Sequence, residues 1–268
     1  PGRYKFENAI VDGSPLIALK AANDYLILNP DKKMELRLVE RSEAQKITLE
    51  HSLESANIKN TRLQVSLFNE VAEDFLPTLL AKSQSKNPSF FMIDPYAHPL
   101  TVPIINQILE RPFTEALINF MHWRINLDAS HPTENYRVDK LFGNNEWRQQ
   151  PFMTASGPER EHGFLDYFLK SISAKYKLCF RIKMDPTDKV AASRTKYYLI
   201  HASNNVRGAL LMKEVMYHLG DLDGTFEYGG RDEQQLSLFT SESRLKDRLI
   251  QTYLGQALAF QDICEQTW

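Results

Sequence analysis

The chain has only two cysteines, Cys179 and Cys264, among its 268 residues. Two cysteines cannot build a disulfide framework or a four-cysteine zinc site, so we expect a reducing, cytoplasmic compartment. No apolar run approaches the roughly 18 residues that a membrane span needs, and no signal peptide is visible. Eleven glycines and 13 prolines are too few for a collagen-like or low-complexity chain.

An excess of charge of one sign is also missing. The chain carries 32 Lys and Arg residues against 34 Asp and Glu residues, so its net charge of −2 indicates no particular partner. No serine nucleophile elbow, phosphate-cradling lysine motif or Cys/His arrangement is present. The seven histidines lack metal-ligand spacing, so we expect no metal. Only His98 and His122 follow strands in a way that predicts a ligand-binding edge.

What the sequence does contain is an alternation of strand and helix patterns. Ser14 followed by Pro15 predicts a helix that begins with Ser14 as its N-cap. Further helices are expected at 43–53, 71–81 and 102–109, and strands at 34–40, 63–68, 90–94 and 116–121. The apolar runs at 90–94 and 116–121 are typical of strands that are buried on both faces. This order predicts an α/β fold with a doubly wound, mainly parallel, Rossmann-like sheet over 1–220.

The second half of the chain has a different pattern. The polar stretch 128–160 is expected to be an insertion or a mobile segment. A helix is predicted at 161–176, and strands at 177–184 and 197–201 are close enough to pair antiparallel at the edge of the sheet. After a helix at 206–219, residues 221–268 are expected to be a linker and the start of a small helical module. The ends, Pro1 without a methionine and Trp268 after an apolar stretch, suggest a piece of a longer protein.

Ligands of open parallel sheets bind at the carboxyl ends of the strands. Glu40 ends one predicted strand, where its carboxylate could accept hydrogen bonds from a ribose diol; the alternative is a solvated glutamate. Asp94 follows the strand FFMI, Pro95 stiffens the loop, and Tyr96 offers a face for a stacked base. An Asp-Pro pair is also a common strand-to-turn signal.

Small residues before the first helix let the backbone approach a ligand, and the helix dipole favours an anion there. These are the pairs Pro1-Gly2 and Gly13-Ser14. Asn69 follows the strand at 63–68, where its amide could bond an adenine edge, although a capping role is the more common one.

Basic residues with interleaved aromatics gather between Lys175 and Lys213, where nine basic residues stand against two acidic ones. This pattern predicts phosphate contacts with base stacking, and a solvated edge hairpin is the alternative. The candidate nucleic-acid contacts are Lys177, Arg181, Lys183, Arg194, Lys196 and Tyr197.

Taken together, the segments PGRY, GSPLIALKAA, LVER, FFMIDPYAHPL, ALINFM, LFGNNEWR and YYLIHASNNVRGALLMKEVMY resemble the three-Cys-motif partner protein (TcmP) family. That family is similar to class I S-adenosylmethionine-dependent methyltransferases. The resemblance implies that Pro1-Gly2 ends the cofactor loop after a first strand upstream of the chain, and that Glu40 holds the ribose hydroxyls. It also implies that the C-terminal residues begin a winged-helix-like segment and that a partner protein carries three cysteines.

The resemblance further implies that Asp94, Pro95 and Tyr96 are the counterpart of the Asp-Pro-Pro-Tyr loop of amino-methylating enzymes. Here the loop has one proline fewer, and Ala97 stands where the family has glycine. The expected function is S-adenosylmethionine-dependent methylation of nucleic acid, on an exocyclic amine of a base. The altered loop motivates an alternative, a non-catalytic nucleic-acid-binding or scaffolding subunit of a multi-protein, bacterial defence system. A nuclease is a third hypothesis, without a visible acidic metal cluster to support it.

Overall fold

The computed structural model describes residues 3–6, 9–82, 87–94, 100–183, 194–219, 227–228 and 250–259. The chain divides into two compact units, Pro1–Lys82 and Ser83–Trp268. The sequence predicted a single domain over 1–220 and gave no signal for this boundary. Each unit is described by itself below.

The first unit contains two small sheets and three helices. In chain order its elements are β1 (Arg3–Phe6), β2 (Ala9–Asp12), α1 (Ser14–Leu28), β3 (Met34–Val39), α2 (Glu43–Ser55), β4 (Leu63–Phe68) and α3 (Ala72–Lys82). Strands β1 and β2 form an antiparallel hairpin, in a stretch where the sequence predicted only a loop. Strands β3 and β4 pair in parallel, from Met34 beside Leu63 to Val39 beside Phe68, so both strands end at the same edge.

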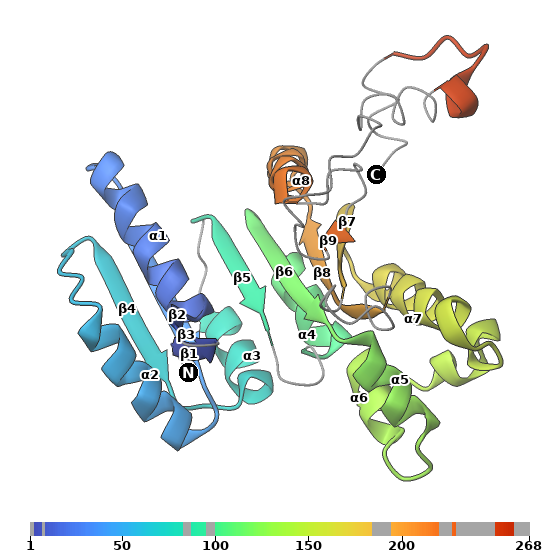
Figure 1. Ribbon diagram of the computed structural model, residues 1–268, viewed down its shortest axis with the longest axis horizontal. Coiled ribbons are helices and arrows are strands. Elements are labelled where there is room, and N and C mark those ends of the chain that lie inside the picture. Colours follow the sequence, from blue (N-terminus) through green and yellow to red (C-terminus); the bar gives the residue numbers. More distant parts are fainter. Residues whose placement is uncertain are drawn as a thin grey trace. The chain divides into compact units, whose positions relative to one another are not determined.

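The second unit is built on a five-stranded sheet with the order β5-β6-β8-β7-β9. Its strands are β5 (Ser89–Ile93), β6 (Thr114–Phe120), β7 (Tyr176–Lys183), β8 (Thr195–Ser203) and β9 (Glu227–Tyr228). Its helices are α4 (Val102–Leu109), α5 (His122–Ser130), α6 (Tyr136–Phe142), the 3₁₀ turns η1 (Glu146–Gln149) and η2 (Pro151–Met153), α7 (Gly157–Ser171) and α8 (Val206–Leu219). Figure 1 shows β5 and β6 side by side, with their arrowheads at the same edge.

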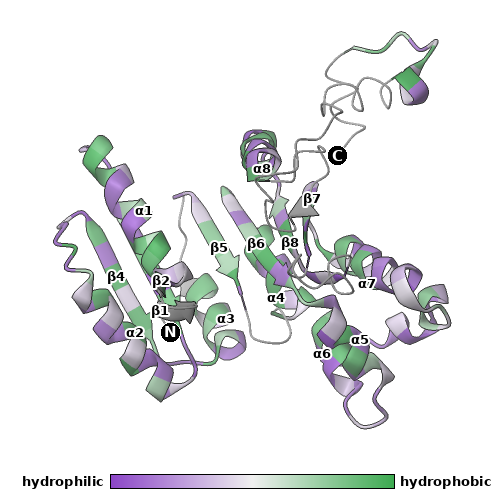
Figure 2. Ribbon diagram, in the orientation of Figure 1, coloured by the Kyte–Doolittle hydropathy of each residue, from purple (hydrophilic) through white to green (hydrophobic). Residues whose placement is uncertain are grey.

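The expected α/β class, with parallel strand pairs and an antiparallel strand beside them, is confirmed. Strand β8 runs antiparallel to both of its neighbours and lies between β6 and β7. The strand β6 is buried along almost its whole length, as its apolar sequence predicted, and Figure 2 shows the apolar character of β6 and α4. The same expectation is wrong for β5, where Phe90 and Met92 are 54% and 51% exposed.

The segment 128–160, expected to be an insertion or a mobile segment, is regular and packed. Helix α6 and the turns η1 and η2 bury five of its apolar side chains: Val138, Leu141, Phe142, Trp147 and Phe152. Asp139 accepts a hydrogen bond from Trp147 Nε1 at 2.9 Å and a two-point contact from Arg148. Polar residues in the stretch that was expected to be an insertion or a mobile segment therefore hold together a folded part of the second unit.

The N-cap of helix α1 lies one residue earlier in the chain than the sequence predicted. Gly13, not Ser14, is the N-cap, and its carbonyl accepts hydrogen bonds from the backbone amides of Leu16 and Ile17 at 3.0 Å. Ser14 is the first helical residue, and Pro15 occupies an early position where a backbone donor is not needed. The linker and small helical module expected at 221–268 lie mainly outside the described residues, which include a helical turn at 250–253.

Candidate functional site

In the first unit, Glu40 directly follows β3 and is half-buried. Its Oε1 accepts a hydrogen bond from the backbone amide of Ser42 at 2.8 Å, and its own amide donates to the carbonyl of Phe68 at 3.0 Å. These bonds fix the carboxylate at the end of the parallel pair. A carboxylate has about four acceptor sites, so Glu40 retains capacity for a ligand's hydroxyl groups.

Asn69 follows β4 and ties the two strand ends together. Its Nδ2 donates to the carbonyl oxygens of Glu40 and Arg41, at 2.9 and 3.0 Å. The amide donors are therefore used within the protein, and only Oδ1 remains for the adenine contact that the sequence suggested. In this structure Asn69 supports the backbone that carries Glu40.

The start of α1 lies toward the same end of β3 and β4. At the other end of the helix, Arg62 Nη1 donates a hydrogen bond to the backbone carbonyl of Asn29 at 3.0 Å. Because Arg62 directly precedes β4, the last turn of α1 lies near the start of that strand. The 15-residue helix is about 22 Å long, close to the roughly 20 Å of a six-residue strand. Gly13 and Ser14 therefore lie toward the carboxyl ends of the strands, as Glu40 does. Pro1 and Gly2 lie outside the described residues.

In the second unit, Asp94 directly follows β5 and is exposed. Its Oδ1 accepts a hydrogen bond from Asn119 Nδ2 at 2.7 Å, and Asn119 lies in β6 with only 7% of its surface exposed. The structure thus holds an accessible carboxylate at the carboxyl edge of two parallel strands. Pro95, Tyr96 and His98 lie outside the described residues.

Tyr197, predicted to contact nucleic acid, belongs to the same edge as Asp94. Leu199 of β8 pairs with Asn119 of β6, so their side chains are on the same face of the sheet. Side chains two residues apart in a strand share a face, so Tyr197 lies on this face as well. Burial raises the pKa of the Tyr197 hydroxyl, and the nearby negative charge of Asp94 raises it further. The sequence named Asp94 and Tyr197 for separate roles, and the structure brings them together.

The other predicted nucleic-acid contacts do not form one open basic surface. Alternation along β7 places Lys177, Arg181 and Lys183 on one face. Lys177 donates to the carbonyl of Leu169 in α7 at 2.6 Å, and Arg181 donates to the Thr195 hydroxyl at 2.6 Å. Arg194 and Lys196 are exposed.

A second polar cluster, which the sequence had not indicated, lies at the carboxyl end of β6. His122 opens α5, and its Nε2 lies 3.3 Å from Glu161 Oε2 in α7. Tyr198 donates to Glu161 Oε1 at 2.6 Å, and Thr195 also hydrogen-bonds this carboxylate. His122 alone could be anticipated, because it follows an apolar strand; Glu161 and Tyr198 carry no sequence motif.

The electrostatics of this cluster favour a neutral histidine and an ionised glutamate. Burial is the main cause that lowers the pKa of His122. The negative charge of Glu161 raises this pKa, and the charges of Arg181 and His162 lower it further. Burial alone would raise the pKa of Glu161, but the bonds from Thr195 and Tyr198 and the nearby His122 and Arg181 leave it lowered. Burial and the bond to Glu161 raise the pKa of Tyr198.

These shifts predict that the second unit loses stability as the solution is acidified. A histidine whose pKa is lower in the folded state stabilises the fold above its unfolded value of about 6.5, and this contribution is lost as the pH falls below that value. We expect the free energy of unfolding, measured with urea, to fall between about pH 7 and pH 5. His122→Gln removes the titrating group, so its free energy of unfolding should vary less over this range.

The matched control is His218→Gln, since the His218 side chain is 71% exposed. This variant should keep the pH dependence of the unchanged protein. An equal slope for His122→Gln and the unchanged protein would contradict the role assigned to His122.

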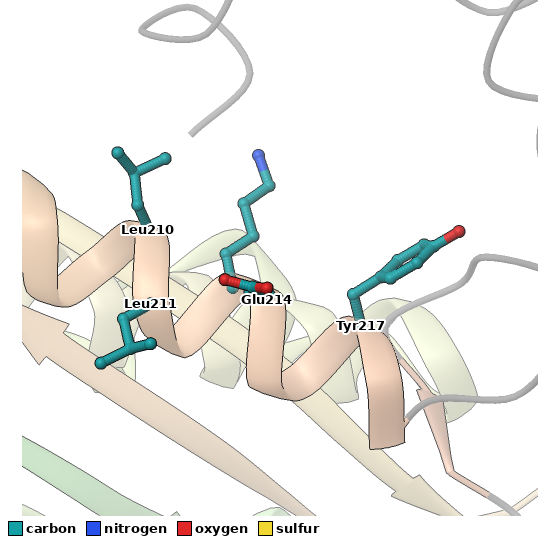
Figure 3. Close-up of a pocket in the computed structure, with 5 residues that line it drawn as sticks. Leu210, Leu211, Glu214 and Tyr217 are labelled. Atoms are coloured by element: carbon teal, nitrogen blue, oxygen red, sulfur yellow. The ribbon is translucent and has the colours of Figure 1, made fainter.

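Three other features do not make a candidate site. Among the described residues, a pocket of about 550 Å³ is lined by five residues of α8, including Leu210, Glu214 and Tyr217, so a single helix supplies this lining (Figure 3). Burial raises the pKa of the Cys179 thiol to about 12, which makes it a poor nucleophile. Within the described ranges, no group of three histidine, cysteine, aspartate or glutamate side chains is arranged to hold a metal ion.

None of the helices in the described part of the chain is both long and apolar enough to cross a membrane. Comparisons of the chain with protein-family models, with curated proteins and with solved structures found no match.

Proposed function

We propose that the protein is an S-adenosylmethionine-dependent methyltransferase that acts on an exocyclic amine of nucleic acid and works with a partner protein that carries three cysteines. The observation that carries the proposal is the exposed Asp94 carboxylate, held by the buried Asn119 at the carboxyl edge of parallel strands. Ligands of such sheets bind at this edge. The sequence resemblance to the TcmP family supplies the cofactor class, and a Rossmann-like sheet is part of the same proposal.

In this proposal the first unit binds the cofactor. Glu40 is held at the end of β3 by the backbone amide of Ser42, which donates to its carboxylate, and by Asn69 Nδ2, which donates to its backbone carbonyl. Its carboxylate is suited to accept bonds from the two ribose hydroxyls. Gly13 and the amino end of α1 lie toward the same strand ends, and a glycine there lets the cofactor approach the backbone.

In the second unit, the proposal assigns Asp94 to the amine that accepts the methyl group. S-adenosylmethionine, when bound, supplies an electrophilic methyl carbon, so the role left to Asp94 is to orient the acceptor amine. Asp94 would accept a hydrogen bond from the amine and fix its orientation, while Tyr197 on the same face limits the space beside it. Removing a base from its stack costs a few kcal/mol, which stacking and pocket contacts repay.

Nucleic acid as the substrate is supported by the excess of basic residues between Lys175 and Lys213. The exposed Arg194 and Lys196 are the members of this set that are best suited to contact phosphate. Removing either of these two charges should weaken binding about equally across nucleic-acid sequences and reduce the salt dependence of the affinity.

The cofactor half of the proposal is tested by calorimetric titration with S-adenosylmethionine. Glu40→Ala should weaken binding by about 1–3 kcal/mol, or roughly 5- to 150-fold, because the ribose hydroxyls lose their acceptor. Glu43→Ala, a change at the exposed start of α2, should leave the affinity unchanged. Absence of heat and of a thermal shift at millimolar S-adenosylmethionine would contradict the proposal.

A non-catalytic nucleic-acid-binding or scaffolding subunit is the second candidate, favoured by Ala97 and the single proline of the Asp94 loop. It predicts affinity for nucleic acid that falls steeply with salt but no transfer of labelled methyl groups. A methylated product that depends on Asp94 would reject it.

A further inference from the structure

Asn119 is a polar side chain in an apolar strand. Its neighbours in β6, Ile118 and Phe120, are fully buried, and Asn119 itself is 7% exposed. A carboxylate only accepts hydrogen bonds, so the 2.7 Å contact requires Asn119 to present its Nδ2 to Asp94. This fixes which end of the amide faces the carboxylate.

The other end of the amide is unused. Asn119 Oδ1 is buried and has no hydrogen-bond partner among the described residues. A buried acceptor without a partner costs about 1–3 kcal/mol, and an apolar residue in β6 would avoid that cost. The position is therefore suited to accept a hydrogen bond from a donor that arrives with a ligand.

We propose that Asn119 is the positioning residue of the acceptor site and that, with Asp94, it selects a primary amine; this inference rests on the proposed function. Asn119 Nδ2 donates to one oxygen of Asp94, and within the described part of the chain the other oxygen receives no hydrogen bond. The free oxygen and Asn119 Oδ1 are then two acceptors at one edge of the sheet. A primary amine has two N–H donors to match them, a hydroxyl has one and a carbonyl has none.

The bond changes leave Asn119 unaltered. The amine nitrogen forms a bond to the methyl carbon of S-adenosylmethionine with its lone pair, and the carbon–sulfur bond breaks with its electrons on sulfur. S-adenosylhomocysteine leaves, and one N–H proton passes to solvent. Asn119 acts through Asp94 and through the orientation of the nitrogen lone pair.

The substitution Asn119→Asp tests this role because it keeps the shape of the side chain and changes its chemistry. Two carboxyl groups within hydrogen-bond distance cannot both ionise easily and share a proton. We expect the acidic limb of the kcat/KM profile to move up by about one pH unit or more, with kcat reduced about 100-fold at neutral pH. If Asn119 had only a structural role, the substitution would change the stability of the protein and leave the acidic limb of the kcat/KM profile in place. Asn145→Asp, at an exposed position before η1, is the matched control.

Substrate choice supplies the second arm of the experiment. Labelled methyl groups should enter poly(A) or poly(C), whose bases carry an exocyclic amine, and not poly(I) or poly(U), whose bases carry a carbonyl at that place. Methyl transfer by the unchanged protein, with the same pH limb in Asn119→Asp, would overturn the inference and leave the proposed function standing. Transfer to poly(I) or poly(U) would overturn the selection of an amine.

A third arm of the experiment does not require methyl transfer, so it distinguishes failure of the proposed function from failure of the positioning role of Asn119. In ¹H–¹⁵N spectra, the side-chain amide signal of Asn119 should shift when Asp94→Ala removes its acceptor, and it should not shift in Asp31→Ala. If the unchanged protein transfers no methyl group, the proposed function fails. An Asn119 signal that does not respond to Asp94→Ala would overturn the positioning role itself.

Discussion

Replacing Asp94 with alanine is expected to lower kcat for methyl transfer by about 100-fold, in the range seen when one positioned polar group is removed from an active site. The carboxylate is exposed, directly follows β5 and is held by Asn119 at 2.7 Å. Without it the amine has no fixed hydrogen-bond acceptor, and its lone pair is no longer oriented for the transfer. The affinity for S-adenosylmethionine should change little, because the proposal assigns cofactor binding to the first unit.

The control for this prediction is Asp31→Ala, an exposed aspartate in the turn before β3. This variant should retain full activity. Initial rates with labelled S-adenosylmethionine, measured beside calorimetric affinities, separate a catalytic loss from a binding loss. Full activity of Asp94→Ala would contradict the role of this carboxylate.

Gly163→Ala is expected to destabilise the second unit by about 3 kcal/mol and to lower its melting temperature by about 10 °C. A methyl group on Gly163 would lie 2.1 Å from Phe152 Cβ and 2.5 Å from its Cγ. Phe152 is buried and packs on Phe164 with ring centroids 4.7 Å apart. Its Cβ is fixed by the backbone of η2, so α7 and η2 would have to separate.

The sign of the change in the free energy of unfolding shows whether Gly163 packs closely against Phe152. Glycine inside a helix is roughly 0.5–1 kcal/mol less favourable than alanine, so Gly163→Ala would stabilise the protein if the close approach to Phe152 were absent. Asp166→Ala, at an exposed position of the same helix, should change the free energy of unfolding by less than about 0.5 kcal/mol. Stabilisation by Gly163→Ala in urea unfolding would contradict the packing described.

Much of the secondary structure could be predicted from the sequence, because it depends on local patterns. The apolar spacing in α8 predicted its bounds, Val206–Leu219, and the turn residues around LQVSLF predicted those of β4. The hairpin β1-β2 and helix α6 were not predicted. Helix α6 has only seven residues, and its stability comes from buried contacts such as Trp147 with Asp139, which sequence spacing does not reveal.

The candidate site could be predicted in part. Glu40 and Asp94 were found because both stand at the ends of predicted strands, and strand ends are where open sheets bind ligands. Asn119 and Glu161 were missed, since a single polar residue within an apolar strand, or within an amphipathic helix, gives no motif. The importance of Asn119 depends on the register between β5 and β6, and that of Glu161 on the packing of α7; both are tertiary properties.

Hydrogen–deuterium exchange with and without saturating S-adenosylmethionine tests the central claim most directly. The account predicts slower exchange in peptides that contain Ser14, Glu40 and Asn69, and unchanged exchange in peptides of α6 and η1. Glu40→Ala should reduce the protection at equal ligand concentration. Equal exchange in the presence and absence of the ligand, or protection that omits Ser14 and Glu40, would contradict the claim that this chain binds S-adenosylmethionine through its first unit.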